Sequence, residues 1–412
     1  MSTPRAAAVT LPLAAAATLM AGWAAYHHDW SGKSSPSVAQ PAPPPPPPKP
    51  HWSPATVNQL LAAVEASRDE GLRPADYQKA ALADAVKSGL SGPALEALAT
   101  RSAVALAHDY AYGRIVHREK FNWHIGNPVP PVAAREADLA NAVNEGRLAG
   151  YLTGLLPRDP RYVALRRALA DTPASELQRI AHIRASMERW RWMPRALGDD
   201  YIWVNVPTYR LALYEGDAPV AMHDVVVGAR KTPTPLISAN VGSVIVNPWW
   251  TLPPTVLAEG HVRAGSKGYV VGRAGNGQIR IRQRPGPKNA LGRVKIDMPN
   301  AYAIYLHDTP AKTLFDKPDR ALSHGCIRVK DIARLAGQLA SPDRVDDAMS
   351  TYATRTLHVQ KTMPVYVVYF TAAPDENGEV ETYSDPYDQD GAMIAALDHD
   401  RMPTTTPIRH TS

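Results

Sequence analysis

The stretch YIWVNVPTYRLALYEGDAPVAMHDVVV, residues 201–227, sets the fold of the C-terminal half of the chain. Past Tyr201 the sequence pattern changes from the helical period to a period of two, and Tyr201–Val206 and Tyr209–Tyr214 are expected to form strands. Glu215-Gly216-Asp217 predicts a turn that leads into a third strand, Pro219–Val227. The segment therefore predicts the start of a β-rich domain.

The same pattern continues downstream. Further strands are expected at Val244–Trp250, Gln278–Arg282, Thr356–Gln360 and Val365–Phe370. The pattern ends at Phe370, so the β-rich domain should hold about 170 residues. From Pro374 onward the chain is polar, and the end beyond Asp398 is expected to be disordered.

Upstream, from about Ser53 to Arg166, apolar residues recur at helical spacing instead, and Ser91-Gly92-Pro93 predicts a break between two helices. A further helix is expected over Pro173–Trp192, with Thr172 as its N-cap. Its apolar stripe is Leu177, Ile180, Ile183, Met187 and Trp190. Arginines occupy other sides, so a membrane-surface helix is one interpretation. A core-packing helix with a solvated basic face is the favoured one.

Length and composition limit the possible classes of protein. A chain of 412 residues exceeds what one core usually uses, so two folded domains are expected. The apolar share of 45% excludes wholesale disorder, although 39 prolines must be concentrated somewhere. The net charge is +6, but the basic residues are scattered and no recognition motif accompanies them. We therefore expect no nucleic-acid partner, while an acidic polymer or an anionic membrane surface fits the charge equally well.

The N-terminal residues predict export. Arg5 is followed by a nearly uncharged apolar run, Ala6–Tyr26, which resembles an export signal and is about long enough to span a bilayer. A cleaved signal and a retained inner-membrane anchor both stay open, and each predicts a periplasmic location. Gln40–Pro50, QPAPPPPPPKP, predicts an extended rod of roughly 30 Å that would hold the folded part away from a membrane.

Cys326 is the single cysteine of the chain, so no intramolecular disulfide can form. A free thiol in an exported protein is exposed to oxidation, and its presence therefore suggests a function. A thiol with a pKa of ~8.5 needs a base to act as a nucleophile near neutral pH. His307 ends the apolar run Ala301–Leu306, which is expected to form a strand, and a strand end is a rigid place to mount a base.

We therefore expect His307 as the base and Cys326 as the nucleophile, with a loop over residues 311–322 returning the cysteine to the histidine. His324 is expected to be buried and to hold that loop together rather than act as a base or ligand. Gly325 lacks a side chain, so backbone N–H groups could approach a developing oxyanion at this point.

Ser323-His324-Gly325-Cys326-Ile327-Arg328 matches the SHGC-x-R/N signature of the L,D-transpeptidase (YkuD) catalytic domain, and the spacing back to His307 fits the upstream histidine of that family. Other stretches resemble its large YcbB-like branch. They are His108–Arg114, Val246–Trp250, Arg282–Pro287, Asn289–Gly292 and Tyr305–Pro310. The resemblance extends over roughly Val57 to Phe370 and is strongest from Tyr201 onward.

The resemblance implies an α+β fold, with a helical N-terminal scaffold domain followed by a β-rich YkuD-like catalytic domain. It also implies a reaction on peptidoglycan stem peptides. Cys326 would attack the carbonyl of the third, diaminopimelate-type residue of a donor tetrapeptide and release the terminal D-alanine. His307 would take the thiol proton and later activate the acceptor amine. Attack of a second stem's side-chain amine on the thioester would give a 3→3 cross-link.

Site residues follow from the same resemblance. The implied catalytic set is Cys326, His307, His324, Gly325, Ser323 and Asp308. Within it, the carbonyl of Asp308 is expected to orient His307. Arg328 is expected to bind a substrate carboxylate or, alternatively, to brace the loop through an ion pair. Candidates for the substrate pocket are Tyr305, Asn247 and Trp250, although core packing is the favoured role for the tryptophan.

These interpretations divide the chain into six parts. They are a signal peptide or membrane anchor at 1–26, a Pro-rich linker at 27–52, a helical scaffold domain at 53–172, a connecting helix at 173–200, the catalytic domain at 201–372 and a partly disordered C-terminal extension at 373–412. YcbB-like proteins commonly carry a peptidoglycan-binding region after the scaffold, but Leu155–Ala170 runs almost directly into the next helix. The stretch Thr251–Gly277, where the branch places a substrate-capping segment, looks short.

Neither a metal nor a cofactor is expected. The chain has 14 histidines, but it contains no H-E-x-x-H and no cysteine pair. Gly272–Gly277 lacks the context of a dinucleotide site. Two alternative functions stay open: an L,D-carboxypeptidase that hydrolyses the same stems, and a non-catalytic wall-binding protein, which would need neither Cys326 nor His307. The acceptor (another stem, a lipoprotein lysine or a free amine) and the oligomeric state also stay open.

Overall fold

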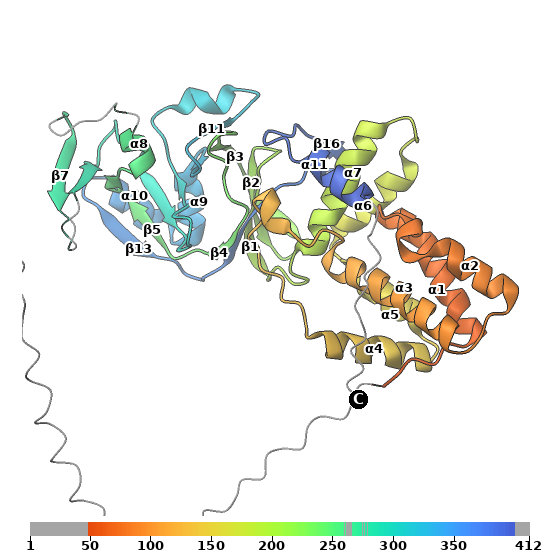
Figure 1. Ribbon diagram of the computed structural model, residues 1–412. Helices are drawn as coiled ribbons and strands as arrows, with labels where there is room; N and C mark the ends of the chain where they lie inside the picture. Colours follow the sequence, from red (N-terminus) through yellow and green to blue (C-terminus); the bar gives the residue numbers. More distant parts are fainter. Residues whose placement is uncertain are drawn as a thin grey trace, which may run out of the picture. The chain divides into compact units, whose positions relative to one another are not determined.

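The computed structural model describes residues 48–258, 260, 266–273, 275, 277 and 279–399. The expected signal or anchor at 1–26, most of the Pro-rich linker and the end of the C-terminal extension lie outside these residues. Among the helices that are described, none is long and apolar enough to cross a membrane. The structure confirms the α+β class, because a helical region comes first and a large sheet follows it (Figure 1).

The N-terminal region is helical. Its helices up to residue 154 largely share a core of their own, whereas those over residues 160–192 pack into the core of the sheet domain. The helices are α1 (Pro54–Ala66), η1 (Ser67–Glu70), η2 (Pro74–Tyr77), α2 (Lys79–Ser88), α3 (Pro93–Tyr112), η3 (Arg118–Phe121), α4 (Val132–Asn144), α5 (Leu148–Gly154), α6 (Pro160–Asp171) and α7 (Leu177–Trp192). Ser53 caps α1 by accepting from the Thr56 N–H, and Leu60 and Leu106 are among the fully buried core residues. The break predicted at Ser91-Gly92-Pro93 is confirmed, since α3 begins at Pro93.

The predicted start of the helix over Pro173–Trp192 was wrong. Thr172 ends α6 rather than capping the next helix, because its hydroxyl donates to the Ala168 carbonyl at 2.6 Å. The chain then turns, and α7 begins at Leu177. A threonine hydroxyl can bond the preceding turn as readily as it can cap a following one, and the sequence alone does not distinguish these two uses.

The interpretation of α7 as a core-packing helix is confirmed, but the solvated basic face is wrong. Arg189 and Arg191 are fully buried. Arg191 pairs with Glu188 at 2.8 Å, and Arg189 pairs with Asp390 at 2.7 Å. Buried charges of this kind are tolerated only when an opposite charge and hydrogen bonds replace water. The C-terminal half of the helix is therefore packed on all sides, whereas Leu177 at its start is exposed.

The C-terminal half forms a large mixed sheet. Its strands are β1 (Asp200–Asn205), β2 (Arg210–Glu215), β3 (Ala218–Gly228), β4 (Ser238–Asn240), β5 (Ser243–Val246), β9 (Val294–Asp297), β10 (Leu306–His307), β11 (Ala321–Ser323), β12 (Ile327–Val329), β13 (Arg355–His358) and β14 (Pro364–Val368). The strand order is β13-β5-β9-β10-β12-β3-β2-β1-β14-β4, and β11 pairs with β3. Most neighbours are antiparallel, whereas β10 and β12 run parallel.

One face of this sheet is closed by helices. α9 (Ile332–Leu339) and α10 (Pro342–Met349) follow β12, and α9 packs against β9. Leu335 and Leu339 of α9 are buried in the same core as Ile296, Leu306 and Ile327 of the strands. Because side chains alternate along a strand, the residues between these apolar positions point to the opposite face.

Two predicted strands were longer than the observed ones. Of Ala301–Leu306 only Leu306 is in a strand, because the Asn300 side chain bonds the backbone of Tyr302 and Ile304 and holds a turn there. Val244–Trp250 is interrupted at Asn247, whose φ of 52° lies in the left-handed region. The chain therefore leaves β5 at Val246 and starts a new strand, β6, at Trp250–Thr251.

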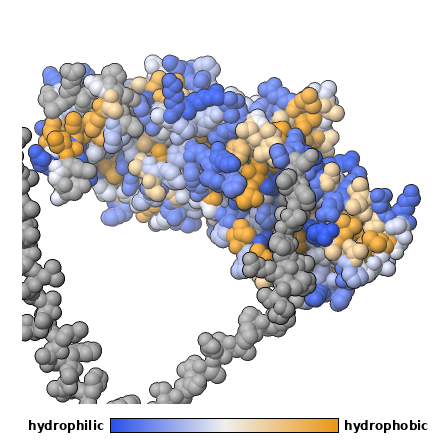
Figure 2. All heavy atoms as spheres, in the orientation of Figure 1, coloured by the Kyte–Doolittle hydropathy of each residue, from blue (hydrophilic) through white to orange (hydrophobic). Residues whose placement is uncertain are grey.

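The stretch after Asn247 forms a small sheet of its own. Its strands β6, β7 (Tyr269–Arg273) and β8 (Ile279–Gln283) pair in the order β6-β8-β7, with α8 (Pro254–Ala258) between β6 and β7. Val271 and Ile279 are exposed there, and Figure 2 shows apolar side chains gathered over this part of the surface, while much of the face drawn is hydrophilic.

The C-terminal extension folds back onto α7. Its described part holds the hairpin β15 (Ala372–Pro374) and β16 (Val380–Thr382), followed by α11 (Asp390–Asp398), which lies beside α7 (Figure 1). Asp390 joins the two elements, since its carboxylate accepts from both Arg189 and His182 at 2.7 Å.

Replacing Asp390 with alanine should lower the free energy of unfolding by about 3–5 kcal/mol, because it leaves Arg189 as an uncompensated buried charge. The matched control is Asp347→Ala, which removes an exposed carboxylate paired with Arg355 and should cost less than about 1 kcal/mol. Chemical denaturation followed by circular dichroism measures both. Equal, small effects would contradict a structural role for the buried pair.

Candidate active site

Two parallel strands bring the predicted site residues together. β10 pairs with β12 so that Leu306 faces Ile327 and His307 faces Arg328, and the Ile327 N–H donates to the Tyr305 carbonyl at 3.2 Å. Cys326 is the residue directly before β12. Because side chains alternate along each strand, four side chains share the face opposite the helices. They are those of Tyr305, His307, Cys326 and Arg328.

The neighbouring strand β9 adds a cation to this face. Lys295 is paired in register with His307, and its Nζ lies 4.2 Å from the centre of the Tyr305 ring. The same Nζ is 2.8 Å from a carboxylate oxygen of Asp297. The sequence analysis did not select Lys295, because a single lysine in a strand pattern carries no signal of its own.

Ser323 and Gly325 shape the loop that presents the cysteine. The Ser323 hydroxyl donates to the Cys326 carbonyl at 2.6 Å and accepts from the Gly325 N–H at 3.1 Å. Gly325 has a φ of 117°, which L-residues with a side chain rarely adopt. Because the Gly325 N–H already donates to the Ser323 hydroxyl, it is not available to an oxyanion. The glycine is needed instead for the backbone conformation of the loop. Thr234 fixes the same loop by donating to the Gly325 carbonyl at 2.7 Å.

His324 is exposed, so the expectation that it would be buried was wrong. The hydroxyls of Ser323, Thr232 and Thr234 donate to carbonyls of the loop. Because these bonds are made by small hydroxyl side chains, the larger imidazole of His324 can point outward.

His307 is buried, and its Nδ1 lies 2.5 Å from the carbonyl oxygen of Asp308. A carbonyl can only accept, so the proton must sit on Nδ1, which leaves the lone pair on Nε2. Burial, with the nearby Arg328 charge as a second cause, lowers the pKa of His307 to about 3. The imidazole is therefore neutral at neutral pH and available as a proton acceptor.

The Asp308 carboxylate is itself held in place. It accepts from the Arg293 N–H at 2.8 Å and pairs with Lys312. Gly292 makes this approach possible, because a Cβ there would lie 2.3 Å from the Asp308 carboxyl carbon. Gly292 is the last residue of the Asn289–Gly292 stretch quoted for the family resemblance. The sequence analysis noted this stretch but did not predict the contact between Gly292 and Asp308.

Cys326 is half-buried, and this burial raises the pKa of its thiol above the usual value. The backbone N–H and the hydroxyl of Tyr305 hydrogen bond to the sulfur and partly oppose the shift in pKa. Burial also raises the pKa of Tyr305, so this hydroxyl stays a donor at neutral pH. Cys326 and His307 are diagonal neighbours on adjacent strands, about 7–8 Å apart at Cβ, and no hydrogen bond joins them within the described part of the chain.

Arg328 has no carboxylate partner among the residues that the structure describes. Its Nε is buried without a hydrogen bond, and burial lowers the pKa of its guanidinium. An ion pair that braces the loop is therefore not formed there. A half-buried cation beside the nucleophile is a suitable partner for a substrate carboxylate.

Asn247 does not line the site, and its selection as a pocket residue was wrong. It is 1% exposed, and its amide group donates to the carbonyls of Ala348, Thr351 and Ala353 while accepting from Arg293. These bonds tie β5 to the segment after α10. Trp250, in contrast, is half-buried and hydrogen bonds the Tyr305 hydroxyl, which places it at the edge of the site. Among the described residues, no group of three or more His, Cys, Asp or Glu is placed to hold a metal ion.

Comparison with known proteins identifies two domains. Residues 199–367 match the sequence model of the YkuD L,D-transpeptidase catalytic domain, and residues 48–169 match that of the Scaffold domain. The protein therefore carries an L,D-transpeptidase catalytic domain. With the scaffold domain in front of it, the chain has the YcbB-like arrangement. The signature at Ser323–Arg328 implied the catalytic domain, and the other stretches quoted with it implied the branch.

Individual proteins are similar to this chain over part of their length. A Haemophilus influenzae protein named "Putative L,D-transpeptidase" is 30% identical over 218 residues, which is 46% of this chain and 44% of that protein. The chain thus matches less than half of the length of this relative. L,D-transpeptidase 1 of Mycobacterium tuberculosis is 12% identical with a TM-score of 0.21, over 41% of this chain and 61% of that one. The catalytic domain of the Enterococcus faecium enzyme is 18% identical with a TM-score of 0.20, over 41% of this chain and 96% of that one.

The geometry predicts a neutral thiol beside a neutral imidazole in the resting site. The rate of Cys326 alkylation by iodoacetamide should therefore rise with pH through a pKa above the usual thiol value, because only the thiolate reacts. Mass spectrometry of the intact protein follows this rate. His307→Gln should leave the profile almost unchanged, since a neutral imidazole does not stabilise a thiolate. A plateau near neutral pH that His307→Gln abolishes would contradict the neutral pair.

Proposed function

We propose that the protein is a peptidoglycan L,D-transpeptidase that forms 3→3 cross-links through a thioester of Cys326. The observation that carries the proposal is the β10–β12 register, which gives Tyr305, His307, Cys326 and Arg328 one common face. The family of the catalytic domain supplies the class of substrate, a stem peptide.

In the first half-reaction, the Cys326 sulfur bonds to the carbonyl carbon of the third residue of a donor tetrapeptide while its proton passes to Nε2 of His307. The Asp308 carbonyl, 2.5 Å from Nδ1, stabilises the imidazolium that forms. The tetrahedral intermediate then collapses, the bond to D-alanine breaks, and the imidazolium gives its proton to the leaving amine. The product is a thioester on Cys326.

In the second half-reaction, the side-chain amine of an acceptor stem attacks the thioester and loses a proton to His307. Sulfur leaves as the thiol, and an amide bond joins the two stems. A neutral histidine suits both halves, because each begins with removal of a proton. The Tyr305 hydroxyl, which stays protonated, is the donor we place at the oxyanion.

The charges around the nucleophile suit an anionic stem. Arg328 and Lys295 are cations close to Cys326 on its face of the sheet, and a stem with diaminopimelate and a terminal D-alanine offers carboxylates to them. We also propose a periplasmic location, reached through the apolar run Ala6–Tyr26, since peptidoglycan is assembled outside the cytoplasm. An inner-membrane tether with the Pro-rich segment as spacer is compatible with this proposal.

Incubation with tetrapeptide muropeptides should give a dimer whose mass lacks one D-alanine, and a carbapenem should add its mass to the intact protein. Cys326→Ala should abolish both, and His307→Gln should slow both by about 100-fold or more, because it removes the proton acceptor. Mass spectrometry measures each product. A tripeptide monomer alone would mean hydrolysis. An adduct that persists in Cys326→Ala would overturn the nucleophile assignment.

Arg328→Gln should lower kcat/KM for the tetrapeptide by about 10-fold to 100-fold, because a charge-assisted hydrogen bond to a substrate carboxylate contributes about 1.5–3 kcal/mol. The matched control is Arg355→Gln, a half-exposed strand arginine on β13. A substrate with its carboxylates amidated should react equally well with the Arg328→Gln variant and with the unmodified protein. If Arg328→Gln slows both substrates alike, the arginine has another role.

A further inference from the structure

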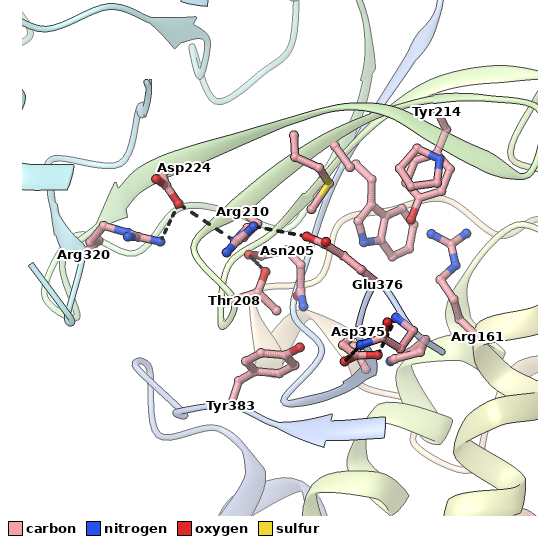
Figure 3. Close-up of a pocket in the computed structure, with 17 residues that line it drawn as sticks. Arg161, Asn205, Thr208, Arg210, Tyr214, Asp224, Arg320, Asp375, Glu376 and Tyr383 are labelled. Carbon is pink, nitrogen blue, oxygen red and sulfur yellow. Dashed lines mark hydrogen bonds and ion pairs between the residues drawn. The ribbon is translucent and has the colours of Figure 1, made fainter. Parts of the chain in front are cut away.

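A second concave site lies on the same sheet, away from Cys326. Its cavity of about 770 Å³ is bounded by β1, β2 and β3 on one side and by the β15–β16 hairpin on the other (Figure 3). We call it the hairpin groove. Its floor is formed by Trp203, Asn205, Arg210, Ala212, Met222 and Asp224. Tyr383 and Glu376 face this floor from the hairpin side, and Arg161 of α6 closes one end.

The hairpin groove and the nucleophile open onto one face of the sheet. Arg210 is in register with Asp224 on β3, and Val226, two residues further along β3, is in register with Arg328 on β12. Positions two apart on a strand share a face, and so do residues in register on neighbouring strands. Asp224 therefore points to the face that carries Arg328 and Cys326. Val226 between them is fully buried, so they are two openings on one face rather than a single trench.

The separation is comparable to the length of the donor stem between Cys326 and the sugar. From the register, Asp224 lies one strand spacing across and four residues along from Cys326, or about 14 Å at the backbone. When the third stem residue reaches Cys326, the three residues between the reacting carbonyl and the sugar span at most about 11 Å. The sugar, attached to the first residue, would thus lie toward the Asp224 end of the hairpin groove.

The charges of the groove balance. Three arginines, at 161, 210 and 320, line it together with Asp224, Asp375 and Glu376. A site for a polyanion would instead carry an excess of cations. Equal numbers of cationic and anionic side chains, which offer both donors and acceptors, suit a neutral ligand that has many hydroxyl and amide groups.

Two charged groups that line the groove, those of Arg210 and Glu376, are free to change partners. The Arg210 guanidinium is half-exposed and makes only long contacts, 3.9 Å to Asp224 and 3.7 Å to Glu376. Glu376 is 75% exposed. Between these groups lie apolar surfaces, since Met222 is 39% exposed and Tyr383 is half-buried. Hydrogen-bonding groups that alternate with apolar and aromatic surface match the hydroxyl edges and C–H faces of a sugar ring.

We propose that the hairpin groove binds the neutral, N-acetylated sugar chain to which the donor stem is attached. This inference rests on the proposed function for the identity of the stem. It gives the chain a means of holding glycan, although α6 runs almost directly into α7 and leaves no room for a separate peptidoglycan-binding module.

The test compares two donors, a free tetrapeptide and the same tetrapeptide on its disaccharide, and measures kcat/KM for D-alanine release from each. The disaccharide form should be favoured by about tenfold or more. Arg210→Ala, and separately Met222→Trp, which fills the groove, should bring that ratio close to one. Arg355→Ala, a strand arginine of similar exposure outside the groove, should leave the ratio as it is. Circular dichroism checks folding, and turnover of the free tetrapeptide serves as the internal reference.

A binding measurement separates the two proposals. Stem-free N-acetylglucosamine oligomers are titrated into Cys326→Ala protein by calorimetry, and the titration is repeated after Arg210→Ala is added. If Arg210→Ala weakens binding of the oligomer about tenfold, the inference is supported. This holds even if the protein releases no D-alanine from stem peptides, a result that would contradict only the proposed function. The inference is overturned if D-alanine is released with no preference for the disaccharide donor. It is also overturned if both groove variants keep the preference. In either case the proposed function still stands. Displacement of the oligomer by a sugar-free stem would also overturn it, in favour of a peptide groove.

Discussion

The parallel pairing of β10 with β12 is the constraint on which the site depends. Each strand is only two or three residues long, yet the pairing fixes which side chains share a face. A shift of one residue would turn Cys326 and Arg328 toward the core and bring Ile327 to the surface. The flanking strands β9 and β3 hold this register from both sides, and the apolar partners Leu306, Ile296 and Ile327 are buried against α9.

Burial then sets the chemistry of the site. A buried imidazole beside an arginine is held neutral, and a half-buried thiol is held protonated, so the resting pair carries no charge. Arg328 is the charge that remains, and it lacks a partner among the described residues. Burial has a different outcome at α7. Arg189 and Arg191 are buried there, but each is paired with a carboxylate. The buried arginines of α7 have carboxylate partners and support the fold, whereas the half-buried Arg328 has none among the described residues and lies beside Cys326.

Much of this arrangement could be predicted from the sequence where a local pattern dictates it. The pattern from Tyr201 onward predicted the first three strands, and the signature at Ser323–Arg328 predicted the catalytic domain that the family model matches. Predictions failed where one polar side chain decides the local structure. The Asn300 side chain holds a turn where an apolar run predicted a strand. The Asn247 amide donates to backbone carbonyls and is therefore not available to a ligand. The buried partners of α7 could not be foreseen either, because Asp390 lies some two hundred residues away in the chain from Arg189.

The most direct test of the central claim is a crystal structure of the acyl-enzyme formed with a tetrapeptide stem. The account predicts continuous density from Sγ of Cys326 to the carbonyl carbon of the third stem residue, with Nε2 of His307 facing that thioester on the Arg328 side of the sheet. It would be contradicted by an acyl group attached elsewhere. It would equally be contradicted by an imidazole at position 307 that lies on the other face of the sheet, where no rotation of its side chain could reach the sulfur.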